Sequence, residues 1–169
     1  DWGDAGNGTL NAAWTHIETE VENAGKEVSR NRVVDLENFN PENRGVFTYN
    51  HFIGDFRLLA RASFYDDWVS SGYSGDSTAR GGDGTGYNVT CAVNRDGCYD
   101  GEWTFDLEAA YSLNDNYTFI LGAQNAFDQD APIENNNLDG TIGSGNRYAT
   151  STPWGFEGQF LYGRVNINF

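Results

Sequence analysis

Few side chains stand at spacings that are typical of acid–base catalysis. His16 and His51 are the only histidines, and no Ser, Cys or Asp stands at a spacing from them that marks a catalytic triad. We expect each to be structural, or lumen-facing if the fold is a barrel. Asp66 and Asp67 could suggest acid–base chemistry or calcium binding, but consecutive strand residues point to opposite faces, so their carboxyl groups should not share a proton. The sequence predicts no enzyme activity, no metal site and no cofactor.

Two glycine-rich runs are the next candidates for chemistry. The run Gly81 to Gly86 lacks the lysine and the helix that follow the phosphate-binding turn of a P-loop. A similar run, Asp139 to Gly145, occurs near the C-terminus. We interpret both as loop tips.

Charge and composition narrow the class of protein. The chain of 169 residues carries 25 acidic and 10 basic residues, a net charge of -15, which disfavours nucleic acid as a partner. Only 38% of the residues are apolar, whereas aromatic residues reach 15% and there are 21 glycines, as expected for strands joined by turns. No apolar run is long enough for a transmembrane helix. Because residue 1 is Asp and the sequence has no Met, we expect a processed product or a fragment.

The secondary-structure elements that would position a functional site are predicted to be strands. From Trp103 to Leu113 apolar and polar residues alternate strictly, with two carboxylates on the polar face, so that face should meet water. Eleven residues exceed the usual soluble strand and match the length that crosses a bilayer at a tilt. The same analysis predicts six strands, at residues 8–21, 45–52, 56–68, 102–113, 117–127 and 155–169.

The connections between these strands alternate in length. Tight turns are expected at residues 53–55 and 114–116, and long loops at 22–43, 69–100 and 128–154, which places every long loop at one end of the sheet. Bacterial outer-membrane barrels have this layout. Aromatic residues near the predicted strand ends fit the girdles of such barrels: Tyr65, Trp68, Trp103, Tyr117, Trp154, Phe156 and Phe169.

Several motifs resemble one family. The stretch NYTFILGAQNAFD from Asn116 is similar to the penultimate strand of TonB-dependent outer-membrane receptors, which commonly ends in Asn-Leu-Phe-Asp. The corresponding residues are Asn125, Ala126, Phe127 and Asp128. The ending on Val165, Ile167 and Phe169 resembles the signal read by the barrel assembly machinery, although Gly163 stands one residue earlier than usual. The segment from Phe39 to Gly45 and the pair Phe64-Tyr65 also fit.

The resemblance implies an all-β, antiparallel transmembrane barrel, of which this chain is about six C-terminal strands out of 22. It further implies a bacterial outer-membrane location with a periplasmic C-terminus and extracellular long loops. The plug would be absent from this chain. Its function would be active import of a scarce nutrient (a siderophore, a vitamin, or an oligosaccharide or peptide), energised by TonB through the plug. Other partners would be lipid, lipopolysaccharide, the rest of the barrel and the assembly machinery.

Three further expectations concern particular side chains. Outer-membrane loops assemble under oxidising conditions, so we expect a disulfide between Cys91 and Cys98. Arg57 and Arg61 should pair with Asp106 and Glu108 on the neighbouring strand. Substrate, if it contacts this segment, should meet loop aromatics and a loop cation: Tyr73, Tyr87, Tyr99, Arg147, Tyr148 and Trp154.

Two alternatives remain open from sequence. A small self-contained outer-membrane barrel, acting as an adhesin or structural protein, would need two more strands, and residues 27–38 are the best place for them. A secreted carbohydrate-binding β-sandwich would instead bury the apolar strand faces against a second sheet.

Overall fold

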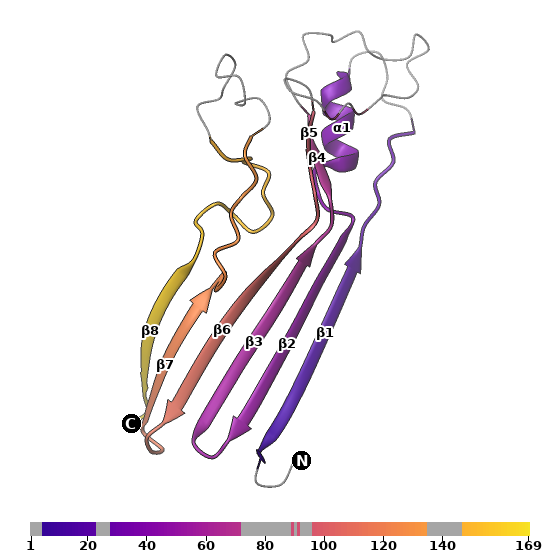
Figure 1. The fold of residues 1–169 in the computed structure, drawn as a ribbon. Helices are drawn as coiled ribbons and strands as arrows, with labels where there is room; N and C mark the ends of the chain where they lie inside the picture. Colours follow the sequence, from indigo (N-terminus) through magenta and orange to yellow (C-terminus); the bar gives the residue numbers. More distant parts are fainter. Residues whose placement is uncertain (1–4, 23–27, 72–88, 90, 92–95, 135–146) are drawn as a thin grey trace.

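The computed structural model describes residues 5–22, 28–71, 89, 91, 96–134 and 147–169. Its main feature is an antiparallel sheet of six strands in the order β1-β2-β3-β6-β7-β8 (Figure 1). Their bounds are β1 Asn7–His16, β2 Asn43–Ile53, β3 Phe56–Tyr65, β6 Glu102–Ser112, β7 Tyr117–Gln124 and β8 Phe160–Ile167. The sheet is open, with β1 and β8 at its two edges.

Two short turns lie at one end of this sheet, which we call the turn end, and the long connections lie at the other, the loop end (Figure 1). The β2–β3 turn needs a left-handed backbone at Gly54, whose φ is 54°. In the β6–β7 turn, the Asn114 side chain accepts hydrogen bonds from the amides of Asn116 and Tyr117 at 2.9 and 3.1 Å. Both turns occur where the sequence predicts them.

All six predicted strands overlap a strand of the main sheet, but several bounds differ. The first strand ends at His16 rather than at residue 21, and the last begins at Phe160 rather than at 155. The strand expected at 117–127 ends at Gln124, because Asn125 takes a φ of 46° that an extended strand cannot contain.

Two of the long connections contain a helix and two short strands that the sequence does not predict. Helix α1, Arg30–Asn38, lies in the first; its N-cap is Ser29, whose hydroxyl accepts from the Arg32 amide at 3.3 Å. This helix occupies the segment in which a smaller barrel was expected to place further strands. The second connection contains β4, Trp68–Ser70, and β5, Gly97–Tyr99, which pair as a separate two-stranded sheet. Among the described residues, no helix is long and apolar enough to span a membrane.

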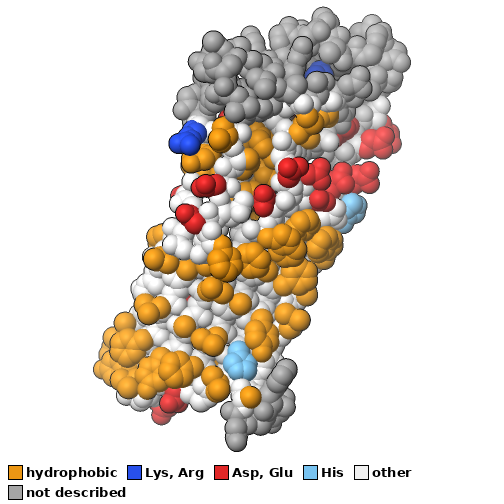
Figure 2. Space-filling view, in the orientation of Figure 1, with side chains coloured by type: hydrophobic (Ala, Val, Ile, Leu, Met, Phe, Trp, Pro, Cys, Tyr) orange, Lys and Arg blue, Asp and Glu red, His pale blue; other side chains and the backbone are white. Residues whose placement is uncertain are grey.

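The strand register divides the main sheet into two faces of opposite character. One, the apolar face, carries no Lys, Arg, Asp or Glu on any of the six strands. It includes Leu10, Ala12, Trp14, Phe47, Tyr49, Phe56, Leu58, Phe64, Trp103, Leu107, Tyr111, Phe119, Leu121, Leu161, Val165 and Ile167. The space-filling view shows apolar side chains covering the strands, with acidic side chains gathered beyond them toward the loop end (Figure 2). Phe169 lies beyond the last strand and is fully exposed.

The opposite, polar face carries all the charged strand residues, and five of them form salt bridges. Arg61 lies 3.7 Å from Asp106, Arg57 pairs with Glu108, and Arg164 lies 3.6 Å from Glu108. The expected pairing of the two arginines with the two carboxylates of β6 is thus confirmed. The sequence from Trp103 to Leu113 predicts this arrangement for its own strand, with apolar side chains on one face and charged side chains on the other.

Tyr162 completes this network on the polar face. Its hydroxyl donates to Glu108 at 2.6 Å, and its ring lies over Gly122 of β7, so closely that a methyl group at Gly122 would overlap it. Glycine at this position lets the aromatic ring pack directly on the neighbouring backbone.

Aromatic residues form two bands on the apolar face. The loop-end band joins Trp14 to Phe64 at 5.6 Å and Phe64 to Trp103 at 5.0 Å between ring centroids. The turn-end band joins Phe56 to Tyr111 at 4.8 Å. Three residues expected in a girdle lie elsewhere: Tyr65 is on the polar face, and Trp68 and Trp154 pack together at the loop end.

Candidate ligand-binding site

A cavity of about 730 Å³ lies at the loop end. One wall comes from β4, β5 and the residues entering β6, and the other comes from the connection between β7 and β8. Its lining consists of Trp68, Cys91, Cys98, Tyr99, Asp100, Glu102, Gln129, Asp130, Ala131, Pro132, Ile133, Arg147, Tyr148 and Trp154. Volumes of this order are typical of small-molecule sites.

The base of the cavity is an aromatic cluster. Trp68, which is 2% exposed, packs on Tyr99 at 5.1 Å and edge-on against Trp154 at 5.5 Å. The Trp68 indole N–H donates to the Ser151 hydroxyl at 3.1 Å, and the Tyr99 hydroxyl donates to Glu134 at 3.2 Å. The Trp154 indole nitrogen is buried and finds no acceptor among the described residues. The cluster is therefore closely packed and retains one unsatisfied donor.

Four polar side chains around this base have no partner among the described side chains. Within the described part of the chain, Asp100, Glu102, Gln129 and Asp130 make no side-chain hydrogen bond or salt bridge. The guanidinium of Arg147 stacks over the Tyr148 ring at 5.6 Å. The lining holds three carboxylates and one guanidinium, so the cavity is acidic and its carboxylates are free to meet a ligand.

One wall of the cavity is held by the turn that follows β7. Asn125 and Asp128 take φ values of 46° and 57°, a conformation that Asn and Asp tolerate better than most residues. The Asn125 side chain accepts from the Gln129 amide at 2.8 Å and donates to the Gln129 carbonyl at 2.9 Å. Asp128 accepts from the Gln159 amide at 2.7 Å, which ties the start of the β7–β8 connection to its end. The motif Asn125, Ala126, Phe127 and Asp128 is thus a structural turn, with the Phe127 ring exposed and packed on Phe105 at 5.3 Å.

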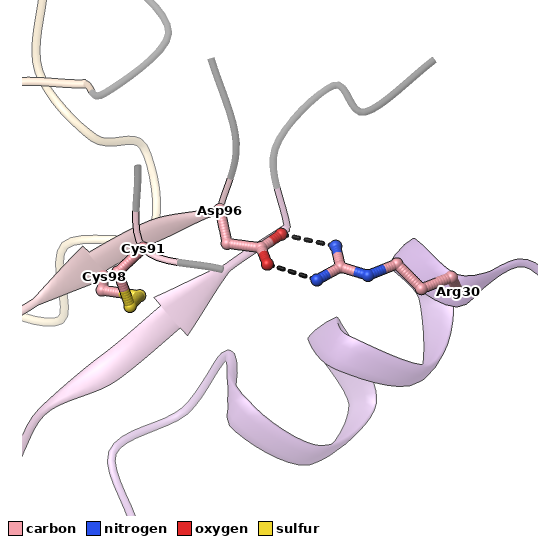
Figure 3. The surroundings of a disulfide bond; sticks show 4 residues. All are labelled: Arg30, Cys91, Asp96 and Cys98. Atoms are coloured by element: carbon pink, nitrogen blue, oxygen red, sulfur yellow. Dashed lines mark hydrogen bonds and ion pairs between the residues drawn. A yellow bond between two sulfur atoms is a disulfide. The ribbon is translucent and has the colours of Figure 1, made fainter. Parts of the chain in front are cut away.

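The other wall is held by a disulfide and a buried ion pair (Figure 3). Cys91 and Cys98 are bonded, with 5.4 Å between their Cα atoms, as the sequence predicts. Beside them Asp96, 1% exposed, accepts two hydrogen bonds from the guanidinium of Arg30, 5% exposed. Arg30 begins helix α1, so this pair joins the first long connection to the second. Sequence reasoning missed the pair because its members are 66 residues apart and match no motif.

A second polar cluster lies near the start of β4, and it corrects one prediction. Asp66 and Asp67 lie between strands, so alternation does not separate their carboxyl groups. Burial, and then a hydrogen bond from its own carboxyl group to that of Asp66, raise the pKa of Asp67 above its usual range. A hydrogen bond from Asn43, 2.6 Å long, lowers the pKa of Asp66. The two carboxyl groups therefore influence each other, which separation on opposite faces of a strand would not allow.

The expected substrate contacts can now be placed. Tyr99, Arg147, Tyr148 and Trp154 all line the cavity, whereas Tyr73 and Tyr87 lie outside the described residues. His16 and His51 share the apolar face rather than the polar one, hydrogen-bonded to Asn43 and Tyr49. Within the described ranges, no group of three or more His, Cys, Asp or Glu could hold a metal ion.

Comparison with known proteins gives no relative: no family model, no curated protein and no solved structure matches this chain. The cavity residues that sequence reasoning missed are Trp68 and the carboxylates Asp100, Glu102 and Asp130. The sequence predicts a strand-end girdle position for Trp68, and it does not single out the carboxylates, because acidic residues are common throughout this chain.

Proposed function

We propose that this chain is the C-terminal part of the barrel wall of a TonB-dependent receptor, which imports a scarce nutrient across the bacterial outer membrane. The observation that carries the proposal is the apolar face: six neighbouring strands present one face without any Lys, Arg, Asp or Glu. A water-soluble sheet would need another layer over such a face. Among the described residues the only other sheet is β4–β5, at the loop end, so a β-sandwich is disfavoured.

The dimensions of the apolar face support burial in lipid. Phe56 of the turn-end band and Phe64 of the loop-end band are eight residues apart on β3, or about 27 Å along the strand. At a tilt of about 40° this gives about 20 Å along the membrane normal, close to the apolar height of outer-membrane barrels. Aromatic rings at both boundaries are typical of these proteins.

The open edges support a larger assembly. In lipid, unpaired backbone groups on β1 and β8 would each be costly, because no water can satisfy them. We infer that further strands pair with both edges and close the barrel. The plug that fills such a lumen would meet the polar face, and TonB would act on that plug.

The position of the cavity supports uptake from outside the cell. It lies at the loop end, which would be extracellular in this orientation, and it offers aromatic rings and unpaired polar groups to an incoming ligand. The turn end would be periplasmic. The chain would contribute wall, ligand contacts and an assembly signal, and no catalysis.

Cysteine labelling tests this topology in intact cells. In Thr150→Cys the new thiol lies at the loop end, and in Asp115→Cys it lies in the β6–β7 turn; both positions are exposed. A membrane-impermeant maleimide should label the first variant in intact cells and the second only after the outer membrane is permeabilised. Equal labelling of both in intact cells would contradict the proposal.

A further inference from the structure

The chemistry of the loop-end cavity is more specific than that of a general nutrient site. We propose that this cavity binds an organic cation, that is, an ammonium or quaternary ammonium group carried on an apolar body. This inference rests on the proposed function, in which the cavity is the extracellular entrance, and it names the class of ligand for that same site.

The first argument is the charge of the lining. Asp100, Glu102 and Asp130 place three carboxylates around the cavity, against the single guanidinium of Arg147. None of the three carboxylates has a hydrogen bond or salt bridge with another described side chain. On the polar face of the sheet, by contrast, Asp106 and Glu108 are each paired with arginine. Carboxylates left unpaired around a cavity favour a cation and disfavour an anionic ligand.

The second argument is the aromatic base. Trp68, Tyr99, Tyr148 and Trp154 all line the cavity, and the first two are fixed by hydrogen bonds to Ser151 and Glu134. The negative face of an aromatic ring attracts a cation, and Trp and Tyr are favoured for this contact. Arg147 already uses the Tyr148 ring in this way. Because Trp68 and Tyr99 are 2% and 6% exposed, a cation would meet the half-buried rings of Tyr148 and Trp154 beside the carboxylates.

The third argument is the acidic setting of the whole loop end. Glu18, Glu20, Glu22, Glu37, Glu42 and Glu134 lie in or beside the long connections. The turn end has only Asp55 and Asp115 in its two turns, so acidic side chains are more numerous at the end where the cavity lies. Such a field raises the local concentration of cations and depends on ionic strength.

The direct test compares two probes of the same shape. Choline carries a quaternary ammonium group, and 3,3-dimethylbutan-1-ol is its neutral carbon isostere. The full polypeptide that carries this sequence is purified in a polyoxyethylene detergent, which contributes neither sugar nor charge, and binding is measured by calorimetry. We expect choline to bind about tenfold more tightly than the alcohol. Equal affinities, or no binding of choline at about 50 mM, would overturn the proposal.

Three variants test whether charge changes choline affinity in the expected direction. Glu102→Gln with Asp130→Asn removes two carboxylates without changing shape, and should weaken choline binding about tenfold. Arg147→Gln removes the only cation of the lining and should tighten choline binding a few-fold. Asp55→Asn, in the turn at the opposite end of the sheet, is the matched control and should change nothing.

The competing ligand class is a neutral oligosaccharide, for which maltotriose is the probe. If maltotriose binds, and both the carboxylate and Arg147 variants weaken it, the cavity is a sugar site and the cation proposal fails. None of these outcomes alters maleimide labelling of Thr150→Cys and Asp115→Cys. A failed ligand assignment is therefore distinguishable from a failed receptor assignment.

Discussion

The sheet and the loop end of this molecule are stabilised in different ways. The sheet repeats one pattern across six strands, and its ion pairs lie on strands that are neighbours or next neighbours. The loop end is held by a few separate contacts. Arg30 to Asp96 and Trp68 to Ser151 join distant segments, and the disulfide joins Cys91 to Cys98, seven residues apart. Removal of one contact should therefore lower the stability of the sheet only slightly, whereas removal of one contact at the loop end should destabilise that region strongly.

The two regions also differ in how they use charge. On the polar face of the sheet, Glu108 is bonded by Arg57, Arg164 and Tyr162. At the loop end, Asp100, Glu102 and Asp130 line a cavity without such partners among the described residues. Paired charges are typical of a structural role, and unpaired charges beside a cavity are typical of binding.

The largest effect should come from the buried ion pair of the loop end. Asp96→Asn removes the carboxylate charge that pairs with the buried Arg30 guanidinium, which should cost about 3–5 kcal/mol of local stability. Hydrogen exchange should accelerate in α1 and β5 while the six strands stay protected. The double variant Arg30→Met with Asp96→Leu should recover much of the loss. Uniform loss of protection across the sheet would erase the distinction between the two regions.

Charge placed on the apolar face should rank next. Ala12 and Ala13 are adjacent exposed residues of β1 that point to the apolar and the polar face respectively. Ala12→Arg should destabilise the bilayer-inserted protein by about 2–4 kcal/mol, and Ala13→Arg should be close to neutral. Denaturant titration in vesicles measures both. Equal costs for the two variants would mean that the apolar face does not contact lipid.

A smaller effect is expected where Tyr162 packs on the backbone of β7. Gly122→Ala places a methyl group in the ring of Tyr162, and overpacking of this kind costs about 1–3 kcal/mol. Gly163, opposite Leu121 on the apolar face, is the control: Gly163→Ala meets only ordinary contacts and should be tolerated. The two variants are compared by denaturant titration. A larger cost at Gly163 would contradict this packing.

The smallest effect should come from the pair Asp66 and Asp67. The raised pKa of Asp67 means that its protonated form stabilises the fold, a contribution that is lost as pH rises through that raised pKa. Asp66 has a lowered pKa, so its ionised form stabilises the fold at pH values above the usual carboxyl pKa. This stabilisation is lost as the pH falls through the lowered pKa. Asp67→Asn should therefore stabilise the β3–β4 region at neutral pH, by less than about 1 kcal/mol since Asp67 is exposed. Hydrogen exchange followed against pH checks this, and the gain should vanish in acid.

Much of the sheet was predictable, because alternation specifies which residues share a face. The segment Trp103 to Leu113 gave the orientation of β6, and the register of β3 then brought Arg61 opposite Asp106. Helix α1 was not predictable, because its sequence is short and polar and only Val33 and Val34 mark a buried side.

The loop end was only partly predictable, because its contacts depend on distances that the sequence does not contain. Residue type alone selected Tyr99, Arg147, Tyr148 and Trp154, which do meet at one cavity. The Asp66–Asp67 prediction was wrong because the rule for strands was applied to residues that lie between two strands.

The most direct test of the central claim, that the apolar face contacts lipid, uses spin labels on the protein in bilayers. Leu121→Cys places the label in the middle of β7 on the apolar face, where Leu121 is 71% exposed, and Ala13→Cys places it on the polar face. Power saturation should find the Leu121 label accessible to oxygen and inaccessible to a water-soluble nickel chelate, with less oxygen access at Ala13. A Leu121 label that the chelate reaches freely would contradict the account.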